Sequence, residues 1–142
     1  PETMKAFVKS VADTIHGIQP SAMVTVGSAK RKWLKQYWVD DTLGLDFYQY
    51  HYYDYMEGED PLAAPYGELN ITKQVIAGEF PTKGYTHTLT AFLDTFLNKG
   101  YSGAWAWSYG AGDKSSDLSA NISEYTRWLE EYERKNTHLS VQ

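Results

Sequence analysis

Cysteine is absent from this chain of 142 residues, which excludes disulfides, thiolate chemistry and cysteine-ligated zinc together. No apolar run approaches the roughly 18 residues of a membrane span, so we expect no membrane partner. Basic residues are also scarce: the net charge is -5, and the single basic run covers residues 30–32. Binding to a phosphate backbone needs a positive stripe, so we expect no nucleic acid partner either.

Sequence motifs for several chemistries are also missing. No Walker, Rossmann or metalloprotease motif occurs, and the four histidines are too scattered for metal-ligand spacing: His16, His51, His87 and His138. We therefore expect neither a metal nor another cofactor. The segment 27–29 lacks the second glycine of a nucleophile elbow, which disfavours serine hydrolysis, and the Gly-x-Gly at 110–112 is too short a signal for a phosphate loop.

Aromatic residues are abundant, at 15% with 12 Tyr and 5 Trp, and apolar residues make up 42%. This composition indicates a globular chain with a core. Tyr and Trp either fill a core or offer flat surfaces to ligands, and composition leaves that choice open. The chain starts at Pro1 rather than at a methionine, which suggests a processed or excised piece.

Helical and strand-like patterns alternate along the chain. Apolar residues recur at intervals of three and four from 4 to 15 and predict a helix over 2–17 with one buried stripe. Further helices are predicted around 33–38, 89–97 and 122–132, and short apolar runs predict strands at 22–27, 45–51, 74–79 and 101–107. Whether another helix lies in the irregular stretch between the second and third strands is left open.

The spacing of the strands indicates a parallel sheet. They begin about every 23 to 29 residues, the rhythm of βα units. A complete (β/α)8 barrel takes about 250 residues, so four strands amount to about half of one. We therefore predict an α/β fold, half of a TIM barrel, as a single unit over 1–142. An open doubly wound sheet is the alternative.

Chemistry in parallel α/β folds gathers at the carboxyl ends of the strands. Those ends are the segments 27–28 and 51–54 with Glu79 and Trp107. Glu79 closes the apolar run 75–78, and Gly78 lets another backbone or a ligand approach closely. Glu79 is therefore the candidate catalytic carboxylate. The alternative is a glutamate that is only salt-bridged or solvated.

Strand parity groups the neighbouring side chains. His51 and Tyr53 share a face of their strand, as do Trp105 and Trp107, because side chains alternate between faces. The small Ala104 on the other face admits an outer helix closely. We expect Trp107, nearest the carboxyl end, to offer a flat surface to a sugar, and Trp105 to fill core one layer deeper.

The remaining carboxylates have simpler interpretations. Four of them lie in the long loop after the second strand and are expected to be a solvated surface: Asp54, Glu57, Glu59 and Asp60. Asp113 and Asp117 flank a glycine-containing turn and are expected to be turn and cap residues.

Four segments resemble a known family. Met23–Gly27, His51–Tyr53, Val75–Phe80 and Gly103–Trp107 are similar to strands five to eight of glycoside hydrolase family 5, the cellulase- and mannanase-type barrels of clan A. The similarity covers nearly the whole chain, and the order and spacing of the motifs carry it.

This resemblance implies roles for four residues. Glu79 corresponds to the nucleophile at the end of strand seven, which attacks the anomeric carbon of a β-linked oligo- or polysaccharide. His51 and Tyr53 correspond to residues that position the sugar and the nucleophile, and Trp107 to the tryptophan beneath the sugar. Secretion is a further implication. Pro81 departs from the glycine that many members carry and leaves the shape of the following loop open.

The second catalytic group of the family is missing. A retaining mechanism needs two carboxyl groups about 5 to 5.5 Å apart, and the family acid/base glutamate follows an asparagine, a pair that this sequence lacks. We therefore expect this chain to be inactive or very weak alone.

The two edge strands of the predicted half-barrel would have no neighbouring strand. We therefore predict that a missing N-terminal half-barrel, or a second copy of this chain in a homodimer, completes the barrel. A non-catalytic carbohydrate-binding or structural half-barrel is the alternative.

Overall fold

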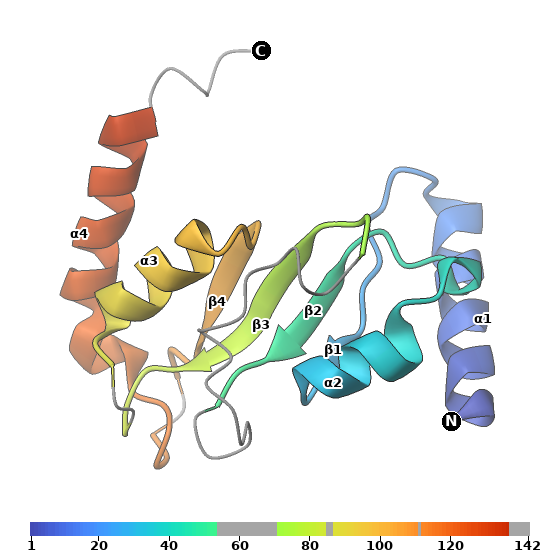
Figure 1. The fold of residues 1–142 in the computed structure, drawn as a ribbon, viewed down its shortest axis with the longest axis horizontal. Helices are drawn as coiled ribbons and strands as arrows, with labels where there is room; N and C mark the ends of the chain where they lie inside the picture. Colours follow the sequence, from blue (N-terminus) through green and yellow to red (C-terminus); the bar gives the residue numbers. More distant parts are fainter. Residues whose placement is uncertain (54–70, 85–86, 111, 137–142) are drawn as a thin grey trace.

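The computed structural model describes residues 1–53, 71–84, 87–110 and 112–136. The main helices are α1 (Glu2–Ile18), α3 (Leu89–Asn98) and α4 (Leu118–Asn136), with shorter turns in α2 (Arg31–Trp33), η1 (Leu34–Trp38) and η2 (Asp41–Leu43). The strands are β1 (Gly27–Ser28), β2 (Tyr48–His51), β3 (Val75–Pro81) and β4 (Gly103–Trp107). The predicted alternation of helices and strands is confirmed (Figure 1).

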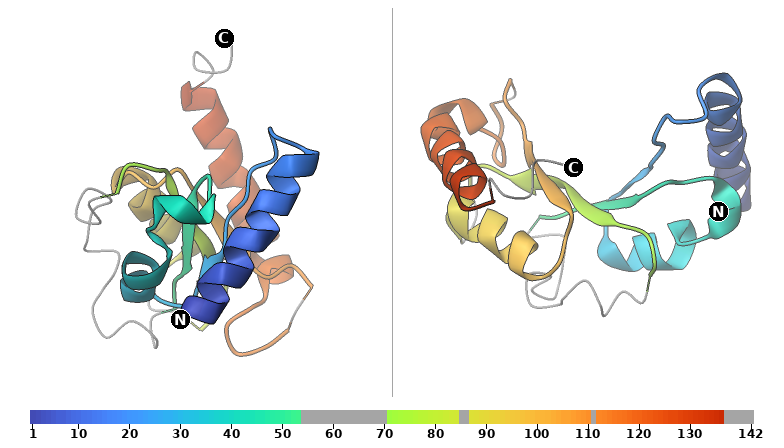
Figure 2. Two further views of the ribbon diagram at one scale, coloured as in Figure 1. Left: turned by 90° about the vertical axis from the view of Figure 1, so that its right-hand side faces the viewer. Right: turned by 90° about the horizontal axis from the view of Figure 1, so that it is seen from above.

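The four strands form one sheet in the order β1-β2-β3-β4, and every neighbouring pair is parallel. A doubly wound sheet reverses its strand order at a switch point, whereas strands that follow one another in sequence order are the arrangement of a barrel segment. In the right-hand view of Figure 2, α2 and α3 lie on one side of the sheet, with α1 beyond its β1 edge and α4 beyond its β4 edge. No helix of the described residues covers the face of the sheet opposite α2 and α3 (Figure 2), and we call it the inner face.

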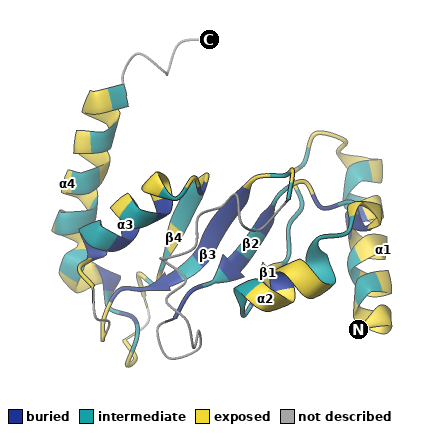
Figure 3. Ribbon diagram, viewed as in Figure 1, coloured by how far each residue is buried: buried dark blue, intermediate teal, exposed yellow. Residues whose placement is uncertain are grey.

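The core lies between the sheet and its helices, on the side that we call the outer face (Figure 3). Aromatic rings dominate it. Phe92 and Phe96 of α3 each pack against Phe80 of β3 with ring centroids 5.8 Å apart, and Tyr52 meets Phe92 edge to face at 5.4 Å. Part of the aromatic content is therefore core volume, which composition alone left open.

The predicted strand over 22–27 is wrong for most of its length, because the β1 ladder covers only Gly27 and Ser28. Its neighbour β2 starts only at Tyr48. Before that point Asp46 takes over the pairing: its backbone N–H donates to the Val24 carbonyl at 2.8 Å, and its carboxylate accepts from the Val24 N–H at 2.7 Å. A side chain replaces one ladder bond there.

The predicted buried stripe of α1 is only partly buried. Ala12 is fully buried and Val8 packs against the core, but Met4 and Phe7 are 55% and 64% exposed. The helix contacts the rest of the chain mainly around η2. Lys5 pairs with Asp40 at 3.1 Å there, and the Thr42 hydroxyl and then Lys5 lower the pKa of Asp40 to about 2. Because the carboxylate form is the one that is stabilised, this contribution is present above about pH 4 and is lost as the pH falls toward 2.

Among the described residues no helix is both long enough and apolar enough to cross a bilayer.

Candidate functional site

The register of the sheet brings the predicted site residues to one edge. His51 at the end of β2 is aligned with Glu79 in β3, and Pro81 at the end of β3 is aligned with Trp107 at the end of β4. Ser28 ends β1 at the same edge. Because the strands are parallel, these are carboxyl ends, where chemistry gathers in such folds.

A β-bulge in β3 decides which way Glu79 faces. Val75 and Ala77 face the outer core, so a regular strand would turn residue 79 the same way. The register instead shifts between Ala77 and Phe80, and Phe80 is the next residue in the outer core. One extra residue is inserted, which inverts the alternation. Glu79 therefore turns to the inner face, together with His51.

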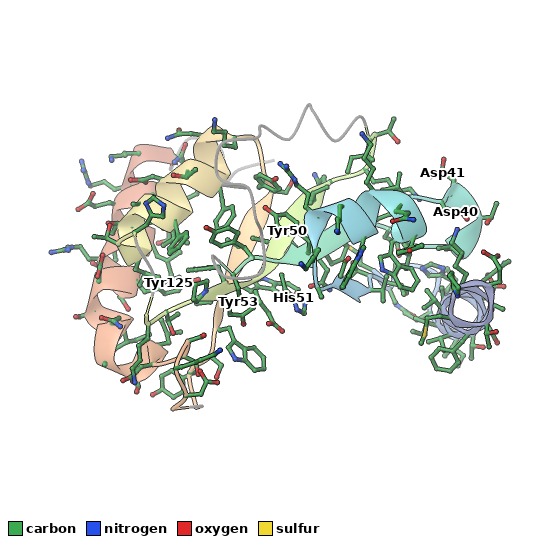
Figure 4. All side chains as sticks on the ribbon, turned by 60° about the horizontal axis from the view of Figure 1, so that its bottom comes forward. Asp40, Asp41, Tyr50, His51, Tyr53 and Tyr125 are labelled. Carbon is green, nitrogen blue, oxygen red and sulfur yellow. The ribbon has the colours of Figure 1, made fainter. Side chains whose placement is uncertain are left out.

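Glu79 makes two contacts through the same oxygen. The Tyr53 hydroxyl donates to Oε2 at 2.8 Å, and Nδ1 of His51 lies 3.2 Å from Oε2. His51 and Tyr53 lie on one side of the sheet and Tyr50 on the other (Figure 4). Tyr53 is 7% exposed, whereas the Glu79 side chain keeps 22% of its surface open. The predicted grouping of these three residues is confirmed as geometry, and their roles stay a prediction.

Two glycines make room for the β2 side chains. A Cβ at position 78 would lie 2.9 Å from Cδ of Gln49, and one at position 27 would lie 2.7 Å from Nε2 of His51. Side chains cannot come that close without a shift, so Gly78 admits Gln49 and Gly27 admits the His51 ring. The close approach predicted at Gly78 was that of a backbone or a ligand; in the structure a neighbouring side chain, Gln49, makes it.

The two tryptophans of β4 share the inner face, as parity predicted, and Ala104 and Ala106 pack against the outer core. Trp107 is 40% exposed at the carboxyl end, the place expected of a sugar platform. The prediction that Trp105 fills core is wrong: it is 54% exposed, because the inner face has no covering layer in the described part of the chain.

The other predicted groups lie elsewhere. Asp54, Glu57, Glu59, Asp60 and His138 fall outside the described residues, as does the helix left open after the second strand. Asp113 is a turn residue: its carboxylate accepts the Ser115 N–H at 2.7 Å, which lowers the pKa of Asp113. Asp117 directly precedes α4, and its carboxylate accepts the Ser119 hydroxyl at 3.2 Å; its role as a cap stays a prediction. His16 contacts Asp46, and no cluster with metal-ligand spacing occurs within the described ranges.

Two residues near the site were given no role from the sequence. Strand parity groups Gln49 with His51, and the structure places the Gln49 side chain against Gly78. Thr82 follows the end of β3 and is fully buried. Its hydroxyl bonds to the Trp107 carbonyl at 2.8 Å, a contact between strands that no local pattern in the sequence indicates.

The close contact between Gly78 and the Gln49 side chain can be tested by substitution. Changing Gly78→Ala inserts a methyl group against Gln49, and we expect a loss of about 1 to 3 kcal/mol in the free energy of unfolding. The double variant Gly78→Ala/Gln49→Ala relieves the clash and should recover most of that loss. Urea unfolding followed by tryptophan fluorescence measures both.

Gly103→Ala is the matched control, because its Cβ would meet only Ile76 Cγ2 at an ordinary 3.5 Å on the neighbouring strand. Equal losses of unfolding free energy in the Gly78→Ala and Gly103→Ala variants would contradict the claim that Gly78 is needed to make room for the Gln49 side chain.

No family model matches the chain. A mannan endo-1,4-β-mannosidase of the blue mussel Mytilus edulis is 29% identical over 155 residues, which covers 96% of this chain and 40% of the relative. The chain thus spans about two fifths of the length of the curated relative it matches.

Two solved structures are similar in fold. A β-mannanase from Mytilus edulis superposes with a TM-score of 0.69 at 29% identity, over 78% of this chain and 36% of the mussel chain. An endo-1,4-β-mannanase from Eisenia fetida gives 0.66 at 26%, over 84% of this chain and 39% of the other. These similarities confirm both the resemblance to family 5 glycoside hydrolases of the mannanase type and the fold as part of their (β/α)8 barrel.

Proposed function

We propose that the inner face carries half of the active site of a retaining endo-β-mannanase, with Glu79 as its nucleophile. The observation that carries the proposal is the contact of Glu79 with both Tyr53 and His51 at the carboxyl end of the sheet. The similarity to two β-mannanases supports β-linked mannan as the substrate.

In the first step an oxygen of Glu79 attacks the anomeric carbon, and the bond to the leaving sugar breaks with its electron pair passing to the glycosidic oxygen. We assign the attack to Oε1, because Tyr53 and His51 both contact Oε2. Fixing one oxygen sets the angle of the other, and such positioning contributes much of the rate in bound reactions. Trp107 offers its exposed ring surface to the apolar face of the sugar.

The leaving oxygen needs a proton, and water must later attack the glycosyl-enzyme. Both tasks fall to a second carboxyl group about 5 to 5.5 Å from the nucleophile. Among the described residues, the Glu79 carboxylate contacts the Tyr53 hydroxyl and the His51 ring, neither of which is a carboxyl group. We propose that the acid/base lies in the part of the barrel that this chain does not match, and that the chain alone is inactive or very weak.

The edges of the sheet support completion by a second half. Beside β1, α1 exposes Met4 and Phe7, and at the opposite end β4 and α4 expose Trp105 and Leu129. Parallel strands at both edges allow β4 of one half to pair with β1 of another. We propose that a further half-barrel covers these surfaces, and that in solutions of this chain alone the half-barrel is a second copy.

Polymeric mannan is too large to enter a cell, so we propose that the protein is secreted and acts outside the cell.

A non-catalytic sugar-binding half-barrel is the second candidate function. The exposed Trp107 beside the Glu79 site favours it, because stacking on a sugar needs no acid/base.

Replacing Glu79→Gln separates catalysis from binding. The test protein is a chimera in which this chain replaces the matching stretch of the Mytilus edulis mannan endo-1,4-β-mannosidase. Release of reducing sugar from β-mannan should fall by about 10³-fold or more, because an amide is no nucleophile. Mannohexaose binding, followed by tryptophan fluorescence, should persist.

Glu130→Gln, an exposed change on α4, is the control and should leave hydrolysis unchanged. Unaltered hydrolysis in the Glu79→Gln chimera would sink the assignment. Binding without hydrolysis in every version, the unsubstituted chimera included, would favour the non-catalytic candidate.

The mass of the chain in solution tests the proposed pairing with a second copy. Light scattering at micromolar concentration should give about twice the 16.2 kDa of one chain, because burying the apolar edges stabilises the pair. Phe7→Glu, placed on the exposed stripe of α1, should shift the mass to the monomer, whereas Ser10→Glu on the same helix should not. A monomeric mass for the unaltered chain refutes this pairing.

A further inference from the structure

Thr82 joins the loop after β3 to the loop after β4. Its hydroxyl donates to the Trp107 carbonyl and accepts from the Asp117 N–H, both at 2.8 Å. Its backbone N–H donates to the Ser115 carbonyl at 2.9 Å, and its carbonyl accepts from Asn121 Nδ2 on the first turn of α4 at 3.0 Å. Every polar atom of this fully buried residue is thus bonded to the loop or helix that follows Trp107.

Pro81, which precedes Thr82, is aligned with Trp107 at the end of the ladder, and proline has no N–H to donate. The N–H of Thr82 donates to the Ser115 carbonyl. The Thr82 hydroxyl is therefore the group of this segment that donates to the Trp107 carbonyl.

A glycine shows that the two loops are in direct contact. Gly84 has a left-handed φ of +68°, and a Cβ there would lie 2.6 Å from the Lys114 carbonyl oxygen. The backbone of one loop therefore lies against the backbone of the other. Thr82, two residues before Gly84, is bonded to the same two segments.

We propose that Thr82 is a positioning residue that holds Trp107 in a set place relative to Glu79. Glu79 lies in β3, three residues before Thr82, which directly follows that strand. The Thr82 hydroxyl holds the Trp107 carbonyl, so one residue couples the carboxylate to the aromatic platform. Thr82 touches neither sugar nor reacting atoms. The inference rests on the proposed function only where sugar binding is concerned.

Thr82→Val tests the coupling because it keeps the shape of the side chain and removes both hydroxyl hydrogen bonds. In the full chain we expect the Trp107 indole N–H to lose order, seen as a lower heteronuclear NOE, after assignment of its signal by Trp107→Phe. Mannohexaose affinity should fall about tenfold. Thr82→Ser retains a hydroxyl and should stay within about twofold of the unaltered chain.

Thr95→Val is the matched control. It is the same substitution and also removes a hydroxyl hydrogen bond, here to the Ala91 carbonyl within α3, and it should leave the order of the Trp107 indole unchanged. The Trp33 indole on α2 is an internal reference that should not change in any variant.

The outcomes separate the two proposals. An unchanged Trp107 indole in Thr82→Val, or equal effects of Thr82→Ser and Thr82→Val, overturns the role of Thr82. If the unaltered chain binds no mannohexaose but Trp107 loses order in Thr82→Val alone, the role of Thr82 stands and the sugar site fails. If the mannohexaose affinity falls without a change at Trp107, Thr82 acts by another route and the proposal is wrong.

Discussion

The site depends on one irregularity in β3, the bulge between Ala77 and Phe80. Without it the alternation that places Val75 and Ala77 in the outer core would place Glu79 there too, as an unpaired carboxylate among phenylalanines. With it, Phe80 completes the core and Glu79 faces the open side. A single inserted residue therefore keeps Phe80 in the outer core and turns Glu79 to the inner face, where we propose that it acts. Gly78 lies within this bulge and leaves room for the Gln49 side chain.

The two faces of the sheet follow different physical rules. The outer face is a closed aromatic core, in which Phe80 and Tyr52 interlock with α3. The inner face keeps Trp105 and Trp107 exposed. The buried Thr82 joins the end of β3 to the end of β4 and to the segment that follows it, and the position that we propose for Trp107 rests on these hydrogen bonds.

Much of this could be predicted from the sequence, because period-two and period-3.6 patterns report directly on faces and helices. The alternation of side chains along a strand was enough to predict that His51 and Tyr53 share one face, and that Trp107 faces into the barrel. Burial of the α1 stripe and of Trp105 was predicted wrongly, because a sequence pattern indicates an apolar surface but not what covers it. The bulge and the Thr82 hydrogen bond were missed, since both depend on register between strands, which the sequence of one strand does not encode.

Trapping the reaction intermediate tests the central claim, that Glu79 is the nucleophile, most directly. An activated 2-deoxy-2-fluoro mannobioside slows the breakdown of a glycosyl-enzyme, because the fluorine destabilises the oxocarbenium-like transition state. Mass spectrometry of the digested chimera should place the label on the peptide and carboxyl group of Glu79. A label on a different carboxylate, or active enzyme that never accumulates one, would contradict it.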